Sequence, residues 1–92
     1  MIARQVFYEG RVQGVGFRYT TRNVARGYDV SGWVLNLPDG RVHLHVQGEA
    51  EEVRAFLAAM LESELNSNIR KAEEHEVPPE GGIKGFEIRQ VP

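Results

Sequence analysis

The chain has 92 residues, of which 41% are hydrophobic and 26% charged, so we expect one domain over residues 1–92 whose core needs neither a disulfide nor a metal. The absence of cysteine excludes thiol chemistry, disulfides and cysteine-based metal sites. No run approaches the ~20 apolar residues of a membrane span, and no apolar signal core is visible, so we expect a cytoplasmic protein without a membrane partner.

The net charge of −2 is unevenly spread along the chain. Residues 1–48 carry six arginines against three acidic side chains, a net +3, whereas residues 49–92 carry ten acidic and five basic side chains, a net −5. The basic half would attract a small anion. A nucleic-acid binder usually has a broader positive surface, so we expect no nucleic-acid partner.

The first predicted elements are a strand over residues 3–12 and a helix over residues 17–26. Apolar residues at period two define the buried face of the strand, which carries Val6, Tyr8 and Val12. Helical spacing defines the apolar stripe of the helix, which consists of Phe17, Thr21, Val24 and Tyr28. Gly27 follows at a position where helices favour a left-handed residue.

A hairpin comes next, with strands over residues 30–37 and 41–47 joined by a turn at residues 38–40. Apolar and polar residues alternate clearly along the second strand, which predicts a sheet with one buried and one solvated face. We expect the buried face to carry Val42, Leu44 and Val46, and the solvated face to carry Arg41, His43, His45 and Gln47. Trp33, a large side chain on the first strand, is predicted to lie in the core.

The second half of the chain predicts a helix over residues 49–64, a charged edge strand over residues 69–77 and a closing strand over residues 85–91. The helix has an apolar stripe of Val53, Phe56, Leu57, Met60 and Leu61. The element order is β-α-β-β-α-β with a short extra C-terminal strand. It predicts an α+β, ferredoxin-like two-layer sandwich, in which an antiparallel sheet carries two helices on one face.

Residues 10–18, GRVQGVGFR, join the first strand to the first helix and carry the main functional signal. Gly14 and Gly16 allow a positive φ and bring backbone N–H groups close to a ligand, and the helix that follows points its positive end at the same place. Arg18 adds a planar guanidinium that suits a phosphate or a carboxylate. The stretch predicts a phosphate cradle, although a tight turn with one solvated arginine explains the loop equally well.

Other phosphate loops are excluded by residue identity. No Gly-Lys pair follows the glycines, as a P-loop requires, and Tyr19 occupies the third glycine position of a dinucleotide fingerprint. A cysteine phosphatase would need a thiol at the position of Val12. The second polar candidate is Asn36, which ends a strand just before its turn. Taken alone, it is expected to hydrogen-bond the turn.

Two stretches, GRVQGVGFR at residues 10–18 and GWVLN at residues 32–36, resemble the two signatures of the acylphosphatase family. They occur in the family's order and separation, followed by Gly40 and Gly48, and the likeness covers nearly the whole chain. The resemblance implies a ferredoxin-like enzyme that hydrolyses acyl phosphates to a carboxylate and phosphate. We expect it to need no metal and no other cofactor.

The resemblance also implies roles for individual residues. The phosphate-binding arginine corresponds to Arg18, and the asparagine that orients the attacking water corresponds to Asn36. The backbone amides that hold the phosphate belong to Gln13, Gly14, Val15, Gly16 and Phe17. The expected partner is a small-molecule acyl phosphate, and the expected state is a monomer.

The sequence departs from the family pattern at two places. Leu35 occupies a position that is often basic or polar in the family, so attraction of anions near the site is expected to be weaker. Residues 65–69 lack the Gly-Pro pair that commonly follows the second helix, and this difference is expected to alter only a loop.

Three other interpretations stay open at this point. The same fold could bind phosphate or an acyl phosphate without turnover and so regulate a partner. The open sheet face could bind a single-stranded nucleic acid through Phe7, His43 and His45, although Glu9 shares that face and the chain is acidic. His43 and His45 could also ligate a metal, but without an evident third ligand we expect solvated surface histidines.

Overall fold

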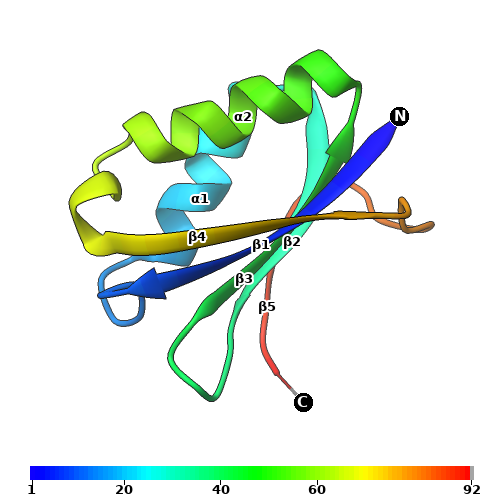
Figure 1. Ribbon diagram of the computed structural model, residues 1–92. Coiled ribbons are helices and arrows are strands. Elements are labelled where there is room, and N and C mark those ends of the chain that lie inside the picture. Colours follow the sequence, from blue (N-terminus) through cyan, green and yellow to red (C-terminus); the bar gives the residue numbers. More distant parts are fainter. Residues whose placement is uncertain (92) are drawn as a thin grey trace.

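The computed structural model describes residues 1–91, which form a five-stranded sheet and two α-helices (Figure 1). The strands are β1 (Ile2–Gly10), β2 (Val30–Asn36), β3 (Val42–Gly48), β4 (Ile69–Val77) and β5 (Phe86–Arg89). The helices are α1 (Phe17–Ala25) and α2 (Ala50–Glu62), and a 3-10 turn, η1 (Asn66–Asn68), precedes β4. Both helices cover the same face of the sheet, so the predicted ferredoxin-like α+β sandwich is confirmed (Figure 1). Neither helix has the length and apolar character needed to cross a membrane.

The strands lie in the order β4-β1-β3-β2-β5, with the charged strand β4 at an edge as predicted. β1 pairs antiparallel with β3 and β4, and β2 pairs antiparallel with β3. β5 pairs parallel with β2, so the prediction of an antiparallel sheet is wrong at this edge. The reason is topological: β4 runs opposite to β2, and the chain reverses once more before it reaches the other edge.

The core lies between the sheet and the helices. Val42, Leu44 and Val46 of β3 are fully buried there, as the alternation predicted, together with Val53, Phe56 and Met60 of α2. One member of the predicted stripe behaves differently, because Leu61 is 47% exposed. Leu61 lies over the sheet edge, where the residues of β4 that line the same hollow are Ala72 and Glu74 rather than large apolar residues. The first strand also ends earlier than predicted, at Gly10, although Val12 beyond it is buried.

The outer face of the sheet is not solvated as predicted. His45 is fully buried and Gln47 nearly so, while His43 is half-buried. The cover comes from residue 80, in the loop between β4 and β5: the Gln47 side chain donates to the Glu80 carbonyl oxygen, and the Glu80 N–H donates back to the Gln47 Oε1. The alternation of apolar and polar residues within β3 cannot predict that a loop much later in the chain covers this face.

Trp33 is buried as predicted, but on this outer face rather than between the sheet and the helices. Its indole stacks on His45, and its Nε1 donates to Glu80 Oε1 at 2.8 Å. Phe7 and His43 also stack on each other, with ring centroids 4.2 Å apart. The rings proposed as platforms for nucleic-acid bases are therefore packed against one another.

Candidate active site

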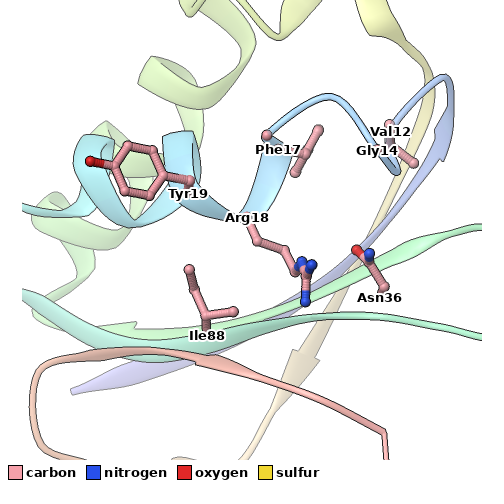
Figure 2. Close-up of a pocket in the computed structure, with 8 residues that line it drawn as sticks. Val12, Gly14, Phe17, Arg18, Tyr19, Asn36 and Ile88 are labelled. Carbon is pink, nitrogen blue, oxygen red and sulfur yellow. The ribbon is translucent and has the colours of Figure 1, made fainter.

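A pocket of about 170 Å³ lies between the start of α1, the loop that precedes it and the end of β2 (Figure 2). Its lining comes from elements far apart in the chain: Val12, Gly14, Gly16, Phe17, Arg18, Tyr19, Asn36 and Ile88. Most of the lining is apolar or backbone. The polar side chains in it are Arg18, Tyr19 and Asn36.

The glycine loop takes the backbone shape that the sequence predicted. Gly14 has φ 75° and Gly16 has φ 78°, both in the left-handed region that glycine enters without a steric penalty. A Cβ built at either position would meet nothing within 4 Å. Glycine is therefore favoured at these two positions by the backbone conformation and not by a lack of space. Gly16 is the N-cap of α1, and its carbonyl oxygen accepts the helical bond from Thr20 N at 2.9 Å. The N–H groups of the first turn of α1 lack helical partners and are available to an anion.

Arg18 is the second residue of α1 and is half-buried. Phe17, the residue before it, is 2% exposed and packs against Tyr8 in the core, which anchors the start of the helix. In residues 1–91, no carboxylate lies within 4 Å of the Arg18 guanidinium. Figure 2 shows the guanidinium extending toward the side chain of Asn36. The charge of Arg18 is thus directed into the pocket without a counter-ion from the part of the chain that the structure describes.

Asn36 is the last residue of β2 and pairs with Val42, which places its side chain on the helix-covered face. Its Oδ1 is buried and has no hydrogen-bond partner among the described residues. The turn beyond it is closed by other groups, since Leu37 N donates to the Arg41 carbonyl and Asp39 accepts from Arg41. The Oδ1 of Asn36 therefore does not hydrogen-bond the turn, as was expected of an asparagine taken alone. A buried acceptor without a partner favours a bound water or ligand.

Sequence comparison agrees with this geometry. The sequence model of the acylphosphatase family matches residues 4–88. The chain belongs to the acylphosphatase family. An acylphosphatase of Rubrobacter xylanophilus is 45% identical over 85 residues, covering 92% of this chain and 77% of that protein. One of Archaeoglobus fulgidus is 41% identical, covering 99% and 86%.

The fold agrees as well. The crystal structure of an acylphosphatase from Bacillus subtilis matches with a TM-score of 0.86 and 31% identity, covering 97% of this chain and 99% of that one. The family resemblance inferred from the two sequence signatures is thereby confirmed.

Not every predicted residue of the acylphosphatase site lines the pocket. Gly14, Gly16, Phe17, Arg18 and Asn36 do, whereas Gln13 and Val15 do not, and Val15 is 40% exposed. Two lining residues, Tyr19 and Ile88, were missed by the sequence analysis. Ile88 has no local signal, because only the parallel pairing of β5 with β2 brings it beneath α1.

The two departures from the acylphosphatase pattern have different consequences. Leu35 pairs with His43, so its side chain lies on the outer face of the sheet, opposite Asn36, and does not line the pocket. The segment at residues 65–69 is more than a variable loop. The Asn68 side chain donates to the Arg11 carbonyl at 3.0 Å, and Arg11 N donates to the Asn68 carbonyl at 2.9 Å, so the segment holds the start of the glycine loop.

The histidines are separate from this pocket. The prediction that His43 and His45 are solvated is wrong: His45 is enclosed between Gln5 and Gln47, which hydrogen-bond its two ring nitrogens. Burial lowers the pKa of His43, and the neighbouring charges of Arg41 and His45 lower it further. Within residues 1–91, no three histidine or acidic side chains are grouped as metal ligands would be.

Proposed function

We propose that this acylphosphatase family member hydrolyses the carboxyl–phosphate bond of small acyl phosphates, with the phosphate held by Arg18 and the glycine loop and the water oriented by Asn36. One observation carries the proposal. Within residues 1–91, a guanidinium that no carboxylate pairs and a buried carboxamide oxygen without a hydrogen-bond partner line the same pocket, beside a left-handed glycine turn and a helix N-terminus (Figure 2).

The chemistry of the leaving group explains which side chains the pocket contains. An acyl phosphate expels a carboxylate whose conjugate acid has a pKa of roughly 4, so the leaving group departs without a proton. No general acid is needed for this step. The described lining accordingly holds no histidine, aspartate or glutamate.

Charge stabilisation falls to Arg18 and to backbone N–H groups. Phosphoryl transfer requires mainly positioning and stabilisation of charge on the phosphate oxygens. The Arg18 fork can bind two of these oxygens, and the amides from Gln13 to Phe17 are proposed to bind the others. The backbone donors are held in place by the glycine turn and the start of α1, so they need little reorganisation in the transition state.

Asn36 is proposed to hold the nucleophile. Its free Oδ1 can accept a hydrogen bond from water and so direct a water lone pair at phosphorus, in line with the departing carboxylate. Attack forms the new P–O bond as the bond to the carboxylate oxygen breaks. A phosphate oxygen takes the proton of the water, which yields inorganic phosphate and a free carboxylate.

The proposal requires no metal and no cofactor, because every interaction above comes from the chain. We further propose a cytoplasmic location and a small-molecule substrate. We also propose that the chain acts as a monomer, since Arg18, Asn36 and the glycine loop all come from the same chain. Gel filtration at micromolar concentration tests the oligomeric state.

The experiment is benzoyl phosphate hydrolysis in excess chelator by the wild type, Arg18→Ala and Asn36→Ala. We expect an active wild type, with each variant slower by about 10²-fold or more. Full activity in Arg18→Ala, or loss of wild-type activity on chelation, would contradict the mechanism. Phosphate binding without turnover at saturating substrate would instead favour a regulatory binding module.

A further inference from the structure

The side chain of Gln13 makes two long-range hydrogen bonds. Its Nε2 donates to the carbonyl oxygen of Leu37 at 2.8 Å and to that of Arg41 at 3.0 Å. A primary amide has two N–H hydrogens, so its donor capacity is fully used. The side chain is partly buried and is directed at the hairpin turn rather than into the pocket.

These bonds connect the two halves of the proposed site. Gln13 belongs to the glycine loop, whereas Leu37 directly follows Asn36 in the chain. The two acceptor residues close the hairpin between β2 and β3, because Leu37 N donates to the Arg41 carbonyl at 2.8 Å. Within residues 1–91, no other hydrogen bond joins the loop at residues 11–16 to this hairpin turn.

We propose that Gln13 is a positioning residue that sets the distance between the phosphate-binding loop and the asparagine that orients water. The inference rests on the function proposed above, and it gives the Gln13 side chain a role distinct from that of the loop amides. Arg18 and the loop determine where phosphorus lies, while the end of β2 determines where the water lies. One amide group joins these two parts of the protein.

The proposed role affects the rate of the chemical step more than the affinity for phosphate. Without the amide, the loop keeps its glycines and its attachment to η1, so the anion site itself is retained. The position of Asn36 relative to the bound phosphate becomes less fixed. A displacement of 1 Å between reacting groups costs on the order of 10²-fold in rate.

A simpler interpretation is that Gln13 only satisfies the turn carbonyls and supports folding. The two roles differ in their dependence on Asn36. A positioning residue that acts through Asn36 loses its effect on rate once Asn36 has been removed. A residue that merely stabilises the fold slows the enzyme by the same factor in both backgrounds.

The test is a double-mutant cycle on the full chain, with Gln13→Met, Asn36→Ala and the double variant, assayed with benzoyl phosphate. Methionine keeps the approximate length of the side chain but cannot donate. We expect Gln13→Met to lower kcat by about 10-fold to 10²-fold, while the inhibition constant of inorganic phosphate changes less than about threefold. In the Asn36→Ala background, the same substitution is expected to lower kcat less than about threefold.

Asp39→Ala is the matched control. It removes two contacts to Arg41 within the same turn and leaves both Gln13 bonds in place, so kcat is expected to stay near wild type. Gln13→Asn, which keeps the amide on a stem one methylene shorter, is the second variant should Gln13→Met fail to fold. It is expected to lose kcat in the same way.

Three results overturn the positioning role alone. The first two are an unchanged kcat in Gln13→Met and equal losses of kcat in the two backgrounds, provided that Asn36→Ala is itself slow. An inhibition constant of phosphate that weakens in step with kcat also overturns it, because Gln13 would then act on binding. If Asn36→Ala keeps full activity, the proposed water step fails, and the positioning role fails with it.

Discussion

Arg18 and Asn36 reach one pocket from different layers of the fold, the first from helix α1 and the second from strand β2 in the sheet (Figure 2). The position of Arg18 depends on the glycine loop and on the burial of Phe17 beneath the helix. The position of Asn36 depends on the register with Val42. Because separate elements support the two side chains, substitutions can test the charge, the loop geometry and the sheet independently.

The geometry of the Arg18 fork is tested by Arg18→Lys, which keeps the positive charge but replaces two rigidly spaced donors by a point charge. We expect kcat/KM to fall by about 10²-fold, and by about 10³-fold or more in Arg18→Ala, which also removes the charge. Steady-state kinetics with benzoyl phosphate measures both. Arg26→Lys, at the exposed C-cap of the same helix, is expected to leave kcat/KM unchanged. Wild-type rates in Arg18→Lys would show that charge alone is sufficient.

The left-handed turn at Gly16 is tested by Gly16→Ala, compared with Gly82→Ala in the loop before β5. The two glycines have φ of 78° and 80°, and a Cβ at either would meet nothing within 4 Å. Each substitution is therefore expected to cost about 1–2 kcal/mol of unfolding free energy in urea titrations. Only Gly16→Ala is expected to lower kcat/KM as well. Equal kinetic losses would mean that the glycine loop has no special role.

Much of this fold could be predicted because its signals are local. The alternation of Val42, Leu44 and Val46 defines one face of β3 without reference to any other element. The glycines at 14 and 16 indicate positive φ in the same direct way. The convergence of Arg18 and Asn36, in contrast, was implied by the family resemblance and not by periodicity.

What could not be predicted depends on partners far along the chain. His45 looked solvated, since alternation predicts a second face but not the loop that covers it. The orientation of β5 and the bonds of the Gln13 side chain depend equally on distant partners, namely β2 and the hairpin turn. Each of these features requires the tertiary structure, so no window of the sequence contains it.

The cover over the outer face is tested by Glu80→Ala. This change removes the acceptor of Trp33 Nε1 but keeps the two backbone contacts between residue 80 and Gln47. We expect a loss of about 1 kcal/mol in the free energy of unfolding, because a largely buried N–H loses its partner. Glu80→Gln keeps a hydrogen-bond acceptor at the end of a side chain of the same length. Its free energy of unfolding is therefore expected to be closer to that of the wild type. If the two variants are equally destabilised, the charge of Glu80 matters more than the bond to Trp33.

The half-buried His43 predicts a pH dependence of stability. Burial, then the charges of Arg41 and His45, lower its pKa in the folded state, with Glu80 opposing them. The unfolded chain has the ordinary histidine pKa of about 6.5, so below that pH it binds more protons than the folded chain does. The contribution of His43 to stability is therefore complete above about pH 6.5 and is lost as the pH falls through the lowered folded pKa.

His43→Gln isolates this contribution, because glutamine keeps an N–H donor for Gln5 Oε1 but does not titrate. Urea unfolding is measured at a series of pH values from about 7.5 to about 5. As the pH falls, the free energy of unfolding should decline less in the variant than in the wild type, since the unfolded state no longer gains a proton at this position. His75→Gln is the control, because it removes a histidine from the exposed edge strand and retains His43. Its free energy of unfolding is expected to keep the part of the decline that is assigned to His43. Parallel curves for His43→Gln and the wild type would show that His43 is protonated in the folded state as easily as in the unfolded chain.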